Sequence, residues 1–160
     1  MKNQNQVQAH HNMVQFKEFC KENRGMERLF KHLSSSYGED FQMLSIGGSH
    51  GNFYTCAYNA GIAAELRQRG YETELEGKVG RGRADILLTD SDGNLVAVET
   101  RNTNHKEHVS RSNVKEITFD IKEQVSAVKE SAKCNSPVTA KRMVNQIQAM
   151  ADLVEETLLK

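Results

Sequence analysis

The sequence has little of what marks a membrane protein, a disulfide-stabilised scaffold or a nucleic-acid coat. No stretch approaches the roughly 18 consecutive apolar residues of a membrane span, and residues 1–12 contain no apolar signal core. The three cysteines form no Cys-x-x-Cys pair and have no histidine at zinc spacing, so we expect reduced thiols in a cytoplasmic protein. The 21 basic residues balance the 21 acidic residues, which limits any nucleic-acid contact to a local patch.

The chain has no internal repeat and no long low-complexity linker, and its 160 residues predict a single domain, residues 1–160. Apolar positions at helical spacing predict an N-terminal helical appendage over residues 1–37, with Gly25 as a break between two helical pieces. Residues 34–38, Ser-Ser-Ser-Tyr-Gly, are typical of a turn.

The central segment, residues 41–101, alternates between helical and strand patterns and is expected to form the core. After a short extended piece at its start, a helix is predicted from Phe53 to Arg69, ending at Gly70, which suits a left-handed helix stop. Strand patterns follow at residues 71–76, 84–88 and 95–101. The expected fold class is therefore mixed α/β, with helical elaborations at both ends.

Residues 113–160 predict two C-terminal helices. The first has Asn113 as N-cap and apolar positions from Val114 to Val128, and the second has Ser136 as N-cap with Pro137 at its first position. One face of the second helix is apolar: Met143, Ile147, Met150, Val154 and Leu158. This stripe predicts a core face or a homodimer interface through the terminal helices.

Asp85 and Glu99 lie on two neighbouring predicted strands. Because side chains alternate along a strand, the sequence predicts whether these two acids share a face. Side chains alternate along residues 95–101, so Glu99 and Arg101 share one face. If residues 91–93 form a three-residue hairpin loop with the glycine in the left-handed position, Asp85 lies opposite Glu99. A two-residue Asp-Gly loop would instead place the two acids on opposite faces.

Directly opposed residues have Cβ atoms roughly 4.5–5.5 Å apart, and unpaired carboxylates at that distance repel each other. Mg²⁺ or Mn²⁺ would neutralise the carboxylates of Asp85 and Glu99, so the pattern predicts a metal site. The remainder of both strands is mostly Ala, Ile, Leu and Val, which argues against a solvated face. The alternative interpretation is that both acids are ordinary polar residues on the wet side of a hairpin.

Further charged residues surround this hairpin. One face of the first strand has three acids, Glu72, Glu74 and Glu76. This face either belongs to a functional site or is the solvent-facing side of an edge strand. Glu65 lies at the border of the helix's buried stripe and is either a further acid for the site or a solvated partner of Arg69. Candidate phosphate contacts lie in the glycine-rich loop 77–83 and in the polar segment 102–112: Lys78, Arg81, Arg83, His105, Lys106 and Arg111.

The order of a helix, a Gly-Tyr strand start, a glutamate-bearing strand, Arg-Ala-Asp-Ile and Val-Ala-Val-Glu-x-Arg resembles the PD-(D/E)xK nuclease superfamily over residues 49–101. The resemblance implies a restriction-endonuclease-like core, in which helices flank a small mixed sheet. It also implies a set of site residues: Asp85 and Glu99 as catalytic and metal-binding acids, Arg101 as the basic residue, Glu76 as the upstream acid with Glu74 or Glu65 as substitutes, and His50 before the core helix.

Two positions depart from that family's pattern. Arg101 stands where lysine is usual, and Ala84 precedes the aspartate where proline is frequent. Arginine stays protonated and cannot act as a general base, although it can stabilise charge on a scissile phosphate.

The leading functional hypothesis is a Mg²⁺- or Mn²⁺-dependent endonuclease that hydrolyses phosphodiester bonds in nucleic acid, most simply DNA, during repair, restriction and defence or mobile-element transfer. Two alternatives remain. One is a nuclease-fold protein without catalysis that binds nucleic acid or a protein partner. The other is a small α/β interaction module whose helical ends dimerise.

Overall fold

The computed structural model describes residues 24–41, 53–79, 82–101, 114–133 and 138–159, together with the single positions 14, 17, 18 and 21. Several predicted features lie outside these residues: His50, Arg81, His105, Lys106, Arg111, the helix-capping residues Asn113, Ser136 and Pro137, and nearly all of the extended segment after Phe41.

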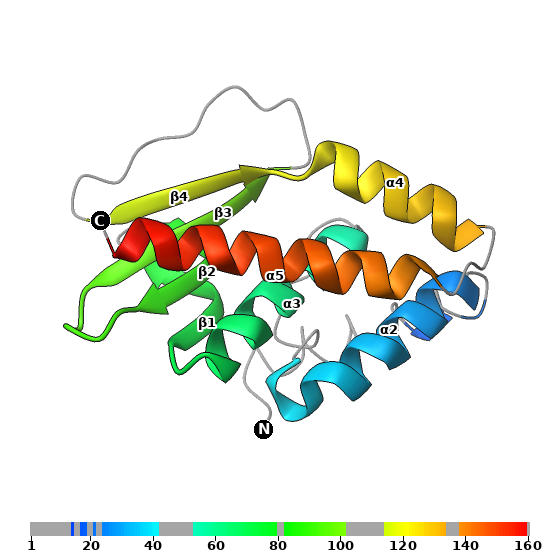
Figure 1. Ribbon diagram of the computed structural model, residues 1–160, viewed down its shortest axis with the longest axis horizontal. Coiled ribbons are helices and arrows are strands. Elements are labelled where there is room, and N and C mark those ends of the chain that lie inside the picture. The colour runs from blue at the N-terminus through cyan, green and yellow to red at the C-terminus, as the bar shows by residue number, and fades with distance from the viewer. Residues whose placement is uncertain are drawn as a thin grey trace.

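The described residues form a mixed α/β fold around a four-stranded sheet in the order β1-β2-β3-β4 (Figure 1). The strands are β1 (Glu72–Val79), β2 (Gly82–Thr89), β3 (Leu95–Arg101) and β4 (Lys115–Asp120). The first three pair antiparallel, and β4 pairs parallel with β3. The helices are α2 (Arg24–Tyr37), α3 (Phe53–Gln68), α4 (Lys122–Lys133) and α5 (Val138–Leu158), with a short 3₁₀ turn η1 (Gly38–Asp40). None of the described helices is long and apolar enough to cross a membrane.

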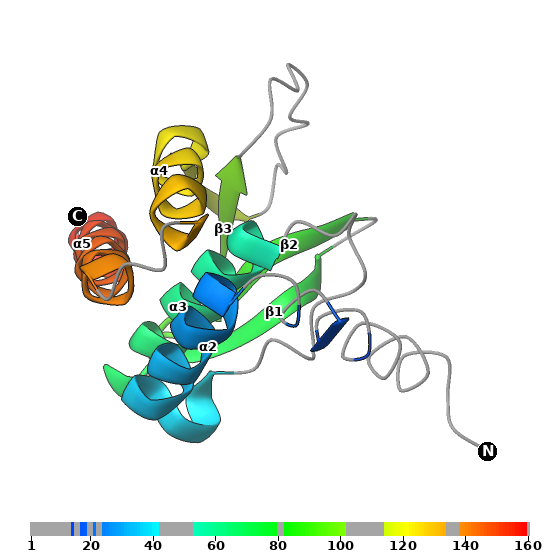
Figure 2. The same cartoon turned by 90° about the vertical axis from the view of Figure 1, so that its right-hand side faces the viewer.

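Helix α3 is the centre of the packing. It contacts β1 and β2 on one side and α5 on the other, and Figure 2 shows α3 between α5 and β1. Tyr58, Ile62 and Leu66, the predicted buried positions of α3, are fully buried. The helix ends as predicted, since Gly70 has a φ of 99°.

The apolar stripe of α5 is confirmed as part of this core. Met143, Ile147, Met150 and Val154 are buried, and Leu158 packs against the same cluster. The stripe that suggested a dimer interface is therefore covered within one chain, and a homodimer would need another surface.

The predicted turn at residues 34–38 is wrong, because α2 continues to Tyr37 before the 3₁₀ turn begins. The physical reason is that Leu33 and Tyr37, four residues apart, both face the core and continue the buried stripe of the helix. The three serines between them had suggested a turn. Gly25, the expected break, lies inside α2. A Cβ there would stand 2.0 Å from the Ala132 carbonyl oxygen, so glycine allows α2 to approach α4 closely.

The predicted helix from residue 113 is also wrong over its first part, because residues 115–120 form β4. Parallel pairing with β3 outweighs the helical spacing, and Ile117 and Phe119 suit a strand. The helix begins only after Asp120, whose Oδ1 accepts a hydrogen bond of 3.1 Å from the Lys122 backbone N–H. The glycine-rich loop expected at residues 77–83 is likewise mostly strand, with Lys78 of β1 paired opposite Arg83 of β2.

Strands β1 and β2 both change faces at one level of the sheet. Leu75 and Ile86 pack in the main core under α3, whereas Val79 and Ala84 belong to a smaller cluster with Leu87 and Ala97 on the opposite face. Strict alternation would have kept Leu75 with Val79 and Ile86 with Ala84. The change occurs at Glu76, whose φ of 52° makes it the only non-glycine residue with positive φ in the described part of the chain.

The left-handed backbone of Glu76 predicts a specific difference between two substitutions. Left-handed backbone costs an ordinary residue about 1–2 kcal/mol, and glycine escapes this cost but loses roughly 0.5–1 kcal/mol of chain entropy. Because Glu76→Gly and Glu76→Ala both remove the charge and the polar side chain, their difference reports the backbone. We expect the glycine variant to be more stable by about 0.5–1 kcal/mol in urea unfolding. A more stable alanine variant would contradict a strained Glu76.

Candidate functional site

Three carboxylate residues lie at the same level on three adjacent strands. The pairing of Ile86 with Val98 places the preceding Asp85 opposite Glu99. The pairs Leu75–Ile86 and Gly77–Ala84 enclose Glu76 and Asp85, so these two acids also oppose each other. We call Glu76, Asp85 and Glu99 the acid row.

The hairpin loop that sets this register has the predicted form. The Asp90 backbone N–H donates to the Asn94 carbonyl at 2.9 Å, and the Gly93 N–H donates to the Asp90 carbonyl at 3.0 Å. Gly93 has a φ of 84°, and the Asp90 carboxylate accepts the N–H groups of Asp92 and Asn94 at 2.9 and 2.8 Å. The three-residue loop is confirmed, and the two-residue alternative is excluded.

Asp85 is held by backbone and side-chain contacts from two elements. Its Oδ2 accepts the Thr100 backbone N–H at 2.9 Å, and the Thr100 hydroxyl oxygen stands 3.4 Å from the same atom. The Thr100 hydroxyl donates to Oδ1 of Asn59, on α3, at 2.5 Å. The Asp85 backbone N–H points to Glu99 Oε2 at 3.5 Å. The carboxylate is therefore tied to β3 and, through Thr100, to α3.

Asn59 was missed by sequence reasoning. It is a buried amide within the otherwise apolar middle of α3, with 7% of its surface exposed. A polar residue in such a helix needs a hydrogen-bond partner, and that requirement is the signal that could have found it.

Burial and like charge raise the pKa of two of these acids, Asp85 and Glu76. Burial, above all, raises the pKa of Asp85 to about 7, and the charge of Glu99, a side-chain hydrogen bond with Glu99 and the charge of Glu76 add to the rise, against the Thr100 N–H. Burial also raises the pKa of Glu76, with Arg83 opposing and Glu99 reinforcing the shift. Acids with such raised pKa values hold their negative charge at a cost in free energy.

The other predicted site residues are spread over different surroundings. Glu65 forms an ion pair of 3.5 Å with Arg69, which also reaches Asp152 and Glu155 of α5, so its contacts tie α3 to α5. Glu74 is exposed on β1. Arg101 is half-buried at the end of β3, on the same face of the strand as Glu99 by alternation. Lys78 and Arg83 are exposed on neighbouring strands.

The acid row suits a hard cation with few protein ligands. No group of three or more His, Cys, Asp or Glu side chains in the described residues is placed to hold an ion together. Mg²⁺ commonly uses one or two carboxylates and keeps several waters, so Asp85 and Glu99 together match its needs. The donor set therefore fits Mg²⁺ or Mn²⁺ and does not fit a closed structural zinc site.

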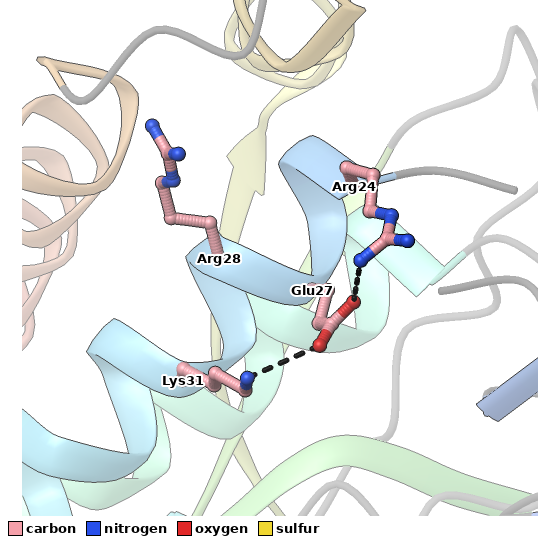
Figure 3. Close-up of a pocket in the computed structure, with 4 residues that line it drawn as sticks. All are labelled: Arg24, Glu27, Arg28 and Lys31. Carbon is pink, nitrogen blue, oxygen red and sulfur yellow. Dashed lines mark ion pairs between the residues drawn. The ribbon is translucent and has the colours of Figure 1, made fainter. Parts of the chain in front are cut away.

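A depression on the surface of α2 has different chemistry (Figure 3). Glu27 accepts ion pairs from Arg24 at 4.0 Å and from Lys31 at 3.1 Å, and Arg28 extends away from them. None of these four residues belongs to the strands of the acid row. We interpret this surface as an ion-paired, solvated helix face.

Comparisons with known proteins did not assign this chain to a family. No protein-family model matches the chain, and neither the curated proteins nor the solved structures gave a match. The function of this protein is therefore inferred from its own residues.

The raised pKa of Asp85 predicts a pH-dependent stability. Between its ordinary value of 3.8 and about 7, Asp85 holds its proton more tightly in the folded than in the unfolded state. The free energy of unfolding should therefore fall as pH rises through that window. Glu76 acts in the same direction, so Asp85→Asn should reduce the fall without abolishing it, by roughly 1–3 kcal/mol, less than full linkage because Asp85 is only partly buried.

Urea unfolding between pH 4 and pH 8 measures this dependence. Asp92→Asn, in the exposed hairpin loop, is the matched control and should keep the wild-type slope. An Asp85→Asn slope as steep as that of wild type would contradict the assignment.

Proposed function

We propose that this protein is a metal-dependent nuclease that hydrolyses phosphodiester bonds, most simply in DNA. The observation that supports it best is the direct opposition of Asp85 and Glu99, with Glu76 at the same level of the sheet. The resemblance to PD-(D/E)xK nucleases places its two metal-binding acids on these same positions. A role in repair, restriction or mobile-element transfer is implied by that resemblance alone.

A purely structural role explains the acid row poorly. Negative charges on neighbouring strands repel one another, and burial makes the charges of Asp85 and Glu76 more costly. Arg83 offsets part of this cost at Glu76, whose pKa is nevertheless raised. Neighbouring acids with raised pKa values are typical of functional sites. A bound cation would offset the free-energy cost of holding their negative charges close together.

In this proposal the chain's own residues bind the ion and the phosphate. Asp85 and Glu99 hold Mg²⁺ or Mn²⁺, and Glu76 adds negative charge beside them. A bound ion would supply Lewis-acid activation of water and charge neutralisation at the phosphate. Arg101, on the strand face of Glu99, donates to phosphate oxygens and stabilises the additional charge of the transition state.

Cleavage of nucleic acid tests the proposal. Purified protein is incubated with supercoiled plasmid and with single-stranded DNA in Mg²⁺ and in Mn²⁺, with EDTA as a parallel control. We expect metal-dependent cleavage that falls by roughly 100-fold or more in Asp85→Ala and in Glu99→Ala. Asp92→Ala, which removes an exposed acid in the β2–β3 loop, is the matched control and should cleave like wild type. Cleavage that persists in the Asp85 and Glu99 variants would contradict the site.

The second candidate is a nuclease-fold protein without catalysis that binds nucleic acid or a protein. Arg101 favours it, because arginine replaces the family's usual lysine and cannot accept a proton. Folded protein that binds Mn²⁺ but cleaves neither substrate would support this candidate over the nuclease.

Substitution of Arg101 tests whether its charge supports cleavage. If it does, Arg101→Ala should lower the cleavage rate at least roughly tenfold, and Arg101→Lys should keep more activity than the alanine variant. Cleavage rates at saturating Mn²⁺ measure this difference. An Arg101→Ala rate equal to that of wild type would remove Arg101 from the site.

A further inference from the structure

The Thr100 hydroxyl stands between two oxygen acceptors. It has one proton to donate, and Asn59 Oδ1 is 2.5 Å away while Asp85 Oδ2 is 3.4 Å away. The hydroxyl therefore donates its hydrogen bond to Asn59, the nearer acceptor, since hydrogen bonds weaken as the distance grows. Asn59 is buried in α3, so water does not readily replace it as the acceptor.

The direction of this proton changes the environment of Asp85. With the hydroxyl hydrogen on the Asn59 side, Thr100 offers Oδ2 of Asp85 one donor, its backbone N–H. Without an acceptor at position 59, the hydroxyl would turn towards Asp85 and donate to the same oxygen. A second donor would occupy a lone pair of Oδ2 that a cation would otherwise use.

We propose that Asn59 is a positioning residue of the acid row: by accepting the Thr100 hydroxyl proton, it keeps that proton away from Asp85 and leaves the carboxylate available to a divalent cation. Asn59 itself does not touch the metal or the substrate. This inference rests on the proposed metal site, and it adds a helix α3 residue that governs how strongly the strands bind the ion.

A double-mutant cycle read by Mn²⁺ binding tests the proposal. Isothermal titration with Mn²⁺ compares wild type, Asn59→Leu, Thr100→Val and the double variant. Asn59→Leu should weaken Mn²⁺ binding about tenfold, at the lower end of the range seen when partners of metal ligands are lost. In the Thr100→Val background, which has no hydroxyl proton to redirect, the same substitution should change affinity less than twofold.

Tyr58→Phe is the matched control. Tyr58 is the neighbouring residue on α3 and donates a hydrogen bond to Gln146 of α5, away from the acid row. Loss of the Tyr58 hydroxyl should lower stability and leave Mn²⁺ affinity unchanged. If instead any loosening of α3 weakened the metal site, Tyr58→Phe would lower the affinity as well. If Asn59→Leu fails to fold by circular dichroism, Asn59→Ala takes its place in the cycle.

The outcomes separate this inference from the proposed function. Equal effects of the Asn59 substitution in both backgrounds, or no effect in either, would overturn the positioning role while leaving the metal site intact. Folded wild-type protein that binds no Mn²⁺ would overturn the metal site itself, before any variant is compared. A tenfold effect that disappears without the Thr100 hydroxyl would establish the role of Asn59.

Discussion

The register of the β2–β3 hairpin is the constraint on which the acid row depends. The left-handed backbone of Gly93 closes a three-residue loop, and the Asp90 carboxylate binds two backbone N–H groups inside it. Because side chains alternate along a strand, a shift of one residue would send Asp85 and Glu99 to opposite faces. A turn at one end of the hairpin thus determines which carboxylates lie opposite each other at the other end.

The fold maintains the acid row against its own repulsion. Glu76 is held in left-handed backbone where β1 and β2 change faces, and burial raises the pKa of Asp85 to about 7. Strain and buried charge at one level of a sheet are the conditions under which proteins commonly build functional sites. Stability comes from elsewhere, chiefly from α3, whose Tyr58 and Ile62 are fully buried. The stable α3 layer therefore supports a costly arrangement on the strands.

Sequence patterns predicted the parts of the fold that depend on short-range spacing. The α3 helix, its stop at Gly70 and the residues of β3 follow from local periodicity, and so does the opposition of Asp85 and Glu99. Strand β4 was missed, because its apolar positions also fit a helix and its pairing partner β3 is distant in sequence. The left-handed Glu76 and the bond from Thr100 to Asn59 depend on tertiary contacts, which no local pattern contains.

In the proposed metal site, Asp85 and Glu99 bind one divalent cation between neighbouring strands. Anomalous scattering from crystals grown or soaked with Mn²⁺ would locate such an ion. We expect an anomalous peak between the two carboxylates, with oxygens of both residues in the first coordination shell. No peak at saturating Mn²⁺, or a peak only at other residues, would contradict the proposed site.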